Sequence, residues 1–362
     1  MFVEDNLVEM DSHFEKISLG LNTKLNDVHM VGICGIGGIG KTIIAGYVYN
    51  QISWGFACSS ILENVREVYK NEGLLHLQNQ LLNDILDGGN QKISNVRQEA
   101  YVIKSSLHSQ KDLIVFYDVD DMNQLEFLVG DHTWFCKGSR IIITIRDKHL
   151  LTMLQVDYVN EVERLDSKEA LKLFSQHAFL PNPPKEDYKY LLDCVIHYCQ
   201  GLPLALKVLG SLLCGKTMSE WESELKKLEK EPEVKIQNVL KTSFDGLDRT
   251  QKKIFIDIAC FFKGEDRDFA SKILDGCGLY GERGIRVLQD RCLITISHNI
   301  ICMHDLIQQM GWEIVCEQHH EDPNKWSRLW NVDDIHCAFE SEKVRLKLNL
   351  IAYLSSFGRL KI

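Results

Sequence analysis

The residues best suited to chemistry lie between positions 35 and 42. Gly35 and Gly40 enclose four residues and are followed by Lys41 and Thr42, which gives the pattern G-x-x-x-x-G-K-T. Glycines let the backbone wrap closely around a phosphate, and the N–H groups of a following helix point at the anion. Lys41 is expected to reach the β- and γ-phosphates, and the Thr42 hydroxyl is expected to bind Mg²⁺. The pattern therefore predicts a loop that binds a nucleoside phosphate.

The surroundings of this loop favour the same interpretation. An apolar run at 28–34 precedes it, and a helical pattern of apolar residues follows it. A phosphate-binding loop requires a strand, a loop and a helix in this order. The alternative, a glycine-rich turn with an exposed lysine, leaves four glycines in six positions unexplained. The residues of this segment expected to contact the nucleotide are Gly37, Gly38, Ile39, Gly40, Lys41, Thr42 and Ile43.

Two buried-strand patterns further along the chain end in polar residues. The run 113–117 is followed by Asp118, and the run 140–145 is followed by Arg146. An acid at a strand end downstream of a phosphate loop is expected to position Mg²⁺, which makes Asp118 a candidate catalytic residue. A guanidinium is suited to grip a phosphate with its planar fork. The alternative for both is a strand that ends at the surface, and spacing alone favours that alternative for Arg146.

Length and composition limit the class of protein. With 362 residues the chain is long enough for two or three domains, and its 45% hydrophobic and 25% charged residues are typical of globular proteins. The net charge of −10 argues against a broad surface for nucleic acid or an anionic membrane. The 12 cysteines show no metal-ligand spacing, and the N-terminus becomes acidic without a signal-peptide pattern. Reduced thiols in the cytoplasm, or in the nucleus, are therefore expected.

The pattern of elements changes along the chain. The first part alternates strand and helix patterns, which predicts an α/β nucleotide-binding domain with a parallel sheet. A mostly helical part follows and predicts a helical bundle, with Pro203 in the first turn of a helix. Helices and then two short strand patterns predict a winged-helix domain, which also raises DNA binding as a rival function. The predicted parts are residues 1–160, 161–232, 233–340 and a divergent tail at 341–362.

A histidine follows the second short strand pattern of the winged-helix part. Asp305, with Gln308 three residues later, fits a capping box at the start of a helix. The residues alone therefore predict a structural role for the neighbouring His304.

A series of short motifs follows a fixed order along the chain. The motifs are GIGGIGKT (35–42), LENVRE (62–67), GSRIIITIRDKH (138–149), ALKLF (170–174), GLPLAL (201–206), FIDIACFF (255–262) and MHD (303–305), and SRLW (327–330) follows them. In type and order they resemble the NB-ARC region of plant TIR-type disease-resistance proteins, receptors with leucine-rich repeats that belong to the STAND class of P-loop NTPases. The resemblance spans roughly residues 5–340, and SRLW fits the segment after the winged helix.

The resemblance implies a signalling switch that ADP holds closed and that exchange for ATP opens for oligomerisation and immune signalling. The implied partners are an adenine nucleotide, full-length receptors and further copies of the chain, with no membrane or nucleic acid. The roles implied for single residues are phosphate and Mg²⁺ binding by Lys41 and Thr42, γ-phosphate sensing by Arg146, an adenine-side contact by Pro203, an adenine wall of Leu7 and Val8, and a contact of His304 with the β-phosphate of ADP.

The chain departs from the family pattern at the strand that ends in acid. The family has two aspartates there, and the first position in this chain is Tyr117. Because neighbouring strand residues point to opposite faces, Asp118 is not expected to replace the missing carboxylate. ADP binding with weak or absent ATP hydrolysis is therefore predicted. Further departures are Glu9 in place of a glycine, Ile43 in place of a second threonine, and Ile145 within the family's TTR motif.

Three other functions remain open from the sequence. The first is a P-loop hydrolase or kinase, which needs the acidic pair that Tyr117 interrupts. The second is a DNA-binding regulator, which needs a basic face that the acidic balance argues against. The third is a truncated regulatory or non-functional paralogue that pairs with full-length receptors, since the chain is expected to lack the TIR and leucine-rich-repeat parts.

Overall fold

The computed structural model describes residues 10–86, 95–179, 188–228, 231–317 and 326–331. The predicted adenine wall of Leu7 and Val8 and the predicted tail at 341–362 lie outside these ranges. The chain divides into two compact units, which are described separately. The first contains Met1–Ser243 and Asp290–Cys292, and the second contains Phe244–Gln289 and Leu293–Ile362.

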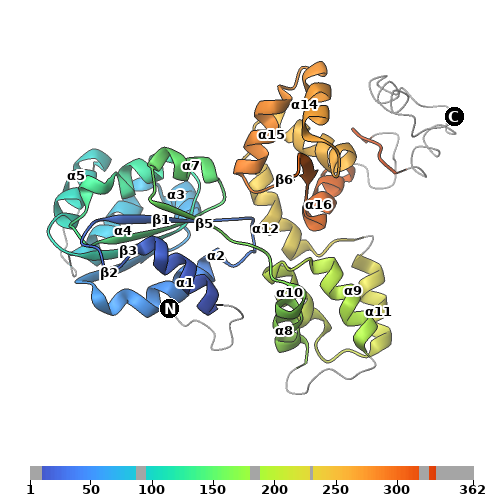
Figure 1. The fold of residues 1–362 in the computed structure, drawn as a ribbon, viewed down its shortest axis with the longest axis horizontal. Helices are drawn as coiled ribbons and strands as arrows, with labels where there is room; N and C mark the ends of the chain where they lie inside the picture. Colours follow the sequence, from blue (N-terminus) through green and yellow to red (C-terminus); the bar gives the residue numbers. More distant parts are fainter. Residues whose placement is uncertain (1–9, 87–94, 180–187, 229–230, 318–325, 332–362) are drawn as a thin grey trace. The chain divides into compact units, whose positions relative to one another are not determined.

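The first unit is built on a five-stranded sheet in which all neighbouring strands are parallel, as the alternation of strand and helix patterns predicts. The spatial order is β2-β3-β4-β1-β5, so β1 and the phosphate loop that follows it lie between two other strands. This arrangement brings the carboxyl ends of β1, β3 and β4 to one edge of the sheet (Figure 1). The strands are β1 (His29–Cys34), β2 (Cys58–Leu62), β3 (Asp112–Val119), β4 (Arg140–Ile145) and β5 (Tyr158–Glu161).

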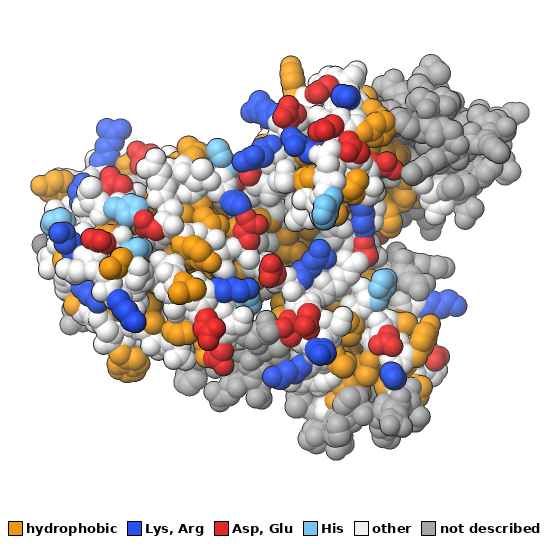
Figure 2. Space-filling view, viewed as in Figure 1, with side chains coloured by type: hydrophobic (Ala, Val, Ile, Leu, Met, Phe, Trp, Pro, Cys, Tyr) orange, Lys and Arg blue, Asp and Glu red, His pale blue; other side chains and the backbone are white. Residues whose placement is uncertain are grey.

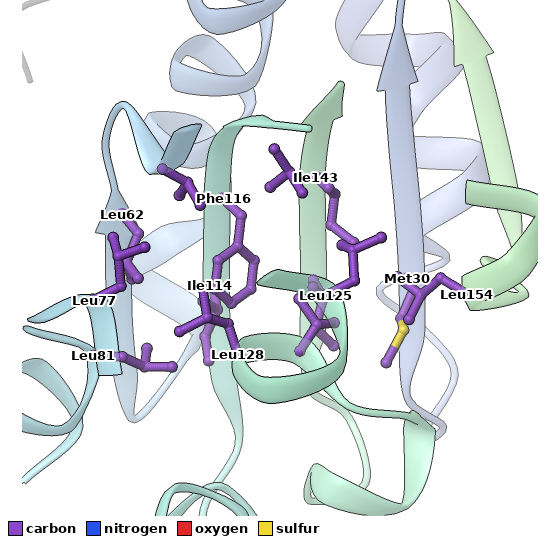
Figure 3. Close-up of a cluster of buried hydrophobic side chains, with 14 of the residues drawn as sticks. Met30, Leu62, Leu77, Leu81, Ile114, Phe116, Leu125, Leu128, Ile143 and Leu154 are labelled. Atoms are coloured by element: carbon purple, nitrogen blue, oxygen red, sulfur yellow. The ribbon is translucent and has the colours of Figure 1, made fainter. Parts of the chain in front are cut away.

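Both faces of the sheet are buried, which explains why its central strands are almost continuously apolar. On one face, Leu77, Leu81, Leu125, Leu128 and Leu154 converge on side chains of the strands (Figure 3). The helical segments on this face are α3 (Val65–Glu72), α4 (Leu74–Ile85), α5 (Val96–Leu107), α6 (Met122–Gln124) with the π-helical turn Leu125–Val129, and α7 (Lys148–Leu154). The other face is covered by α1 (Met10–Leu21) and α2 (Lys41–Ile52). Short 3₁₀ turns occur at Ser53–Gly55 and His132–Trp134.

A helical part completes the first unit. Its centre is Trp221, whose indole N–H donates to the carbonyl of Leu213 at 2.9 Å and whose rings pack edge-on against Phe174 and Tyr188. Pro203 stands in the first turn of its helix, as predicted, where its missing N–H costs no hydrogen bond. The helices are α8 (Ser167–Ala178), α9 (Lys189–Cys199), α10 (Pro203–Leu213) and α11 (Met218–Leu228), and α12 (Val234–Asp245) follows them into the second unit.

The second unit contains helices and one antiparallel hairpin. His298 and Asn299 connect the two strands with φ of 49° and 64°, the left-handed backbone that a tight hairpin turn requires. The two short strands predicted in this part of the sequence are therefore confirmed, and they pair as an antiparallel hairpin. The elements are α13 (Arg249–Asp257), which continues into the π-helical turn Ile258–Phe262, then α14 (Arg267–Gly276), α15 (Gly281–Asp290), β6 (Thr295–Ser297), β7 (Ile300–Cys302) and α16 (Asp305–Cys316).

Acidic and basic side chains are mixed on the visible face of the described residues (Figure 2). Among the helices in the described ranges, none is long and apolar enough to cross a bilayer.

One buried acid on α5 gives the first unit a pH-dependent stability. Glu99 is fully buried, and neither carboxylate oxygen has a hydrogen-bond partner within the described residues. Burial raises its pKa from 4.5 to about 7, so the folded chain binds a proton there that the unfolded chain releases. This contribution to stability is present below about pH 4.5 and is lost as the pH rises to 7.

Glu99→Gln is therefore expected to raise the free energy of unfolding more at pH 8 than at pH 5, by about 2 kcal/mol. Chemical denaturation of both chains at the two pH values measures this difference. An equal effect of the substitution at both pH values would contradict the assignment.

Candidate nucleotide-binding site

The predicted phosphate loop connects β1 to α2, and its lysine is held inside the loop. Lys41 is only 7% exposed, and its ammonium donates to the carbonyls of Gly35 at 2.7 Å and Ile36 at 2.9 Å. Burial lowers the pKa of Lys41 to about 8, and the nearby Arg146 adds to this effect while Asp118 opposes it. A buried ammonium next to another cation is electrostatically suited to bind an anion, and a bound anion would raise the pKa of Lys41 again.

Two glycines of the loop lie against other parts of the first unit. A Cβ at Gly38 would lie 2.7 Å from the side chain of Leu204, and the Gly38 carbonyl accepts from the Leu204 N–H at 3.1 Å. A Cβ at Gly37 would lie 2.9 Å from the carbonyl of Val239 and 3.0 Å from the Arg146 guanidinium. The loop therefore needs glycine at both positions, because α10 and α12 approach its backbone closely.

A cavity of about 610 Å³ opens over this loop within the first unit. Its walls come from the start of α2, the region around the start of α3, the carboxyl ends of β3 and β4, and the helices α1, α8, α10 and α12. The position agrees with the rule that ligands of parallel sheets bind at the carboxyl ends of the strands. The polar and charged side chains among the lining residues are His13, Lys41, Thr42, Asn64, Arg66, Glu67, Asp118, Thr144, Arg146, Glu163, His177, Lys207, Asn238 and Thr242.

Asp118 enters this cavity because β3 is irregular at its end. The register with β4 shifts between Phe116 and Val119, and Asp118 has a φ of 58°. Its N–H donates to the hydroxyl of Thr144 on β4 at 2.9 Å, which fixes the irregular backbone. The alternation of β3 side chains between the two faces of the sheet therefore ends before Asp118. As a result the side chain of Val119 packs in the same buried cluster as that of Phe116.

Tyr117 and Asp118 point in different directions, as expected from the sequence. Tyr117 is 2% exposed and packs in the cluster beneath α2, where burial raises the pKa of its phenol. The carboxylate that lines the cavity belongs to Asp118, contrary to the expectation from simple strand alternation. This position keeps Asp118 as a candidate for metal binding and catalysis.

Two arginines bind the carboxylate of Asp118. Arg66 Nη2 lies 2.8 Å from Oδ2, and Arg146 Nε donates to Oδ1 at 3.1 Å. Arg146 also donates through Nη1 to the carbonyl of Val239 at 2.9 Å, which joins β4 to α12. Arg146 therefore lines the cavity as a largely buried side chain, whereas its spacing alone favoured a solvated strand end.

The structure brings most of the predicted nucleotide contacts to one cavity. Besides Asp118 and Arg146, the lining residues predicted from sequence are Gly38, Ile39, Gly40, Lys41, Thr42, Ile43 and Pro203. Gly37 lies beside them against Val239 and Arg146. Arg66 also lines the cavity, although no role is predicted for it from the LENVRE motif in which it lies, and Lys207, Asn238 and Thr242 are lining residues without a signal in the sequence.

His304 belongs to the second unit and has a structural contact there. It is the N-cap of α16, and its Nδ1 accepts from the N–H of Leu306 at 3.1 Å. The prediction that Asp305 is the N-cap is wrong, because Asp305 is the first helical residue and its carboxylate binds Lys263. The role of His304 toward a phosphate stays a prediction.

The donor set of the cavity fits a nucleotide together with Mg²⁺. Mg²⁺ is commonly bound by one or two protein oxygens, phosphate oxygens and water. The Thr42 hydroxyl is the protein oxygen that would hold it here, whereas both carboxylate oxygens of Asp118 are bound by arginines. Within the described residues there is no cluster of three or more His, Cys, Asp or Glu that would hold a metal without a nucleotide.

These features define a P-loop nucleotide-binding protein with a following winged-helix domain. The NB-ARC domain family matches residues 10–182, and the winged-helix domain described as "Disease resistance protein Roq1-like" matches residues 248–319. The chain thus contains an NB-ARC domain followed by a Roq1-like winged-helix domain, and the relatives that match it along most of its length are plant disease resistance proteins. The predicted family and fold class are thereby confirmed.

Relatives agree with this assignment, and a solved structure shares the fold. Disease resistance protein RPV1 of Vitis rotundifolia is 56% identical over 339 residues, which are 93% of this chain and 24% of RPV1. TMV resistance protein N of Nicotiana glutinosa is 40% identical over 361 residues, which are 98% of this chain and 31% of that protein. The chain thus spans about a quarter to a third of these relatives. A Walker-type ATPase of Pyrococcus abyssi shares the fold with a TM-score of 0.58 at 13% identity, over 85% of this chain and 97% of that protein.

Proposed function

We propose that this chain is the adenine-nucleotide-binding switch of a plant disease resistance protein, closed with ADP and open with ATP. The observation that carries the proposal is the buried Lys41 ammonium, which lies at the start of α2 in a cavity of about 610 Å³. A cation and a helix N-terminus at one point attract a polyphosphate.

Further cations around the cavity support a polyphosphate ligand. Arg66, Arg146 and Lys207 line it together with Lys41. Each charge-assisted hydrogen bond to a phosphate contributes about 1.5–3 kcal/mol. We assign the α- and β-phosphates to the loop around Lys41, the γ-phosphate to Arg146, and Mg²⁺ to Thr42.

The base and the closed state involve other parts of the chain. Pro203 and Leu204 supply apolar wall on the α10 side of the cavity, and we assign the base to that side, with Leu7 and Val8 completing its wall. We further propose that His304 binds the β-phosphate of ADP in the closed state. One such ADP-only contact shifts a closed-to-open ratio by about ten- to a hundredfold, a useful share of the roughly 10⁴ that complete switching needs.

The proposal also assigns a role to each of the predicted domains. We assign residues 1–160 to nucleotide binding, 161–232 to a helical subdomain and 233–340 to the winged-helix subdomain. Protein partners of this region would be full-length receptors or further copies of the chain, in the cytoplasm or the nucleus.

A slow ATPase is the second candidate function, and the position of Asp118 in the cavity favours it. Hydrolysis is nevertheless expected to be weak, since Tyr117 occupies the position of the first family acid and both oxygens of Asp118 are bound by arginines. The expected release of phosphate from ATP is on the order of 10⁻³ s⁻¹ or slower, as in P-loop GTPases without an activating partner. Steady-state phosphate release from the purified chain measures it, and a turnover of about 1 s⁻¹ would make the chain an ordinary enzyme instead.

Calorimetric titration with ADP and AMP, on the chain freed of any nucleotide retained through purification, tests the proposed nucleotide site. Because Lys41 and the loop are assigned to the β-phosphate, AMP is expected to bind at least about tenfold more weakly than ADP. A folded chain that binds neither nucleotide, or both equally, would contradict the proposed function.

A further inference from the structure

Asp118 has an environment that conflicts with simple metal binding. Its two oxygens are bound by two different guanidiniums, Oδ2 by Arg66 at 2.8 Å and Oδ1 by Arg146 at 3.1 Å. The side chains of Arg66, Asp118 and Arg146 are 10%, 20% and 17% exposed. Ion pairs shielded to this degree are screened less by water and salt than pairs on the surface.

A divalent cation at Asp118 would therefore have to compete with two arginines. Each oxygen of Asp118 keeps a second lone pair, but Mg²⁺ requires close to octahedral geometry and retains several waters, and two guanidiniums at the same carboxylate leave little room for them. Two neighbouring guanidinium charges also repel a dication, and this repulsion acts in a partly water-excluded cavity. The same charges attract the phosphates of a nucleotide, so the paired cluster favours a nucleotide over its metal complex.

The two arginines differ in the other groups that they bind. Arg146 donates to the carbonyl of Val239 on α12, so its removal would also loosen the contact between β4 and that helix. Arg66 lies in the first turn of α3, after Asn64 with a φ of 52°, and its only other ion-pair partner among the described residues is the exposed Glu67 at 3.9 Å. Arg66 is thus the residue through which the environment of Asp118 can be changed most selectively.

We propose that Arg66 is a positioning residue that keeps Asp118 paired and away from divalent cations, so that ADP binds in this cavity without Mg²⁺. The inference rests on the proposed nucleotide-binding function and goes beyond it. It names the residue that makes the cavity bind ADP without a metal ion rather than as a complex with Mg²⁺. Loss of the Arg66 charge frees Oδ2 of Asp118 for a cation and leaves Arg146 in place.

The test compares the dissociation constant of ADP in millimolar Mg²⁺ with that in a chelator, for the whole chain and its variants. For the wild type the two constants are expected to agree within about threefold. For Arg66→Gln, Mg²⁺ is expected to strengthen ADP binding about tenfold, which corresponds to one ion pair of this strength. Arg66→Lys keeps the charge and should behave as the wild type, and Arg97→Gln is a matched control at an exposed arginine of α5.

A double variant separates this mechanism from a loss of folding. Arg66→Gln combined with Asp118→Asn removes the carboxylate that Mg²⁺ would use, so the effect of Mg²⁺ is expected to disappear again. The inference is overturned if Arg66→Gln weakens ADP binding equally with and without Mg²⁺, or if the double variant keeps the Mg²⁺ effect. A wild-type chain that binds no ADP under either condition would overturn the proposed function as well, and the two failures are thereby distinguishable.

Discussion

Lys41→Ala is expected to weaken ADP binding at least about a hundredfold, or about 2.7 kcal/mol. The substitution removes the buried ammonium assigned to the β-phosphate, and a charge-assisted hydrogen bond in a shielded site is among the strongest contacts available to a ligand. It also removes the hydrogen bonds to the carbonyls of Gly35 and Ile36 that hold the loop around the lysine.

The matched control for Lys41→Ala is Lys70→Ala, at an exposed lysine of α3 outside the cavity lining. Titration calorimetry with ADP measures both variants, and thermal unfolding shows whether each is folded. An affinity of folded Lys41→Ala within about threefold of the wild type would contradict the assignment of the loop.

Gly38→Ala is the substitution with the second largest expected effect, a loss of about 3 kcal/mol in the free energy of unfolding. The new Cβ would meet the side chain of Leu204 at 2.7 Å, so α10 has to move away from the loop. The backbone at Gly38, with a φ of 80°, also disfavours any residue that carries a Cβ. Because Leu204 lines the cavity, ADP binding is expected to weaken together with stability.

Gly215→Ala separates the two causes of this effect. Gly215 has a φ of 74°, but a Cβ there would meet no atom within 4 Å. Its substitution is expected to cost about 1 kcal/mol, which is the backbone strain alone. Chemical denaturation of both variants measures the two losses in the free energy of unfolding. Equal losses would show that the close contact between α10 and the loop adds nothing to the cost of Gly38→Ala.

The sequence predicts the fold of this chain well because its strongest patterns are local. The motif around Lys41 specifies a strand, a turn and a helix within fifteen residues, and the apolar runs of β3 and β4 are long enough to identify buried strands. The hairpin around His298 and Asn299 follows in the same way from a short polar turn between two apolar runs.

The cavity is predicted less completely, and each omission has a physical reason. The irregularity at Asp118 depends on its hydrogen bond to Thr144 of another strand, which no local pattern encodes. Val239 contributes only its backbone carbonyl, and because every residue has a carbonyl, the residue type does not indicate this contact. Arg66 carries no spacing signal toward Asp118, because 51 residues separate the two.

The N-cap of α16 shows a different limit. His304 and Asp305 are adjacent and both can accept a hydrogen bond from a helix N-terminus, so a shift of one residue decides which of them caps the helix. In the structure the helix begins at Asp305, and the imidazole takes the capping bond.

The nucleotide carried by the purified chain tests the central claim most directly. The chain is to be purified without added nucleotide and denatured, and the released small molecules are to be separated and quantified by chromatography. A switch that is closed with ADP is expected to release close to one ADP per chain and little ATP. A folded chain that releases no adenine nucleotide, and that does not bind added ADP, would contradict the account.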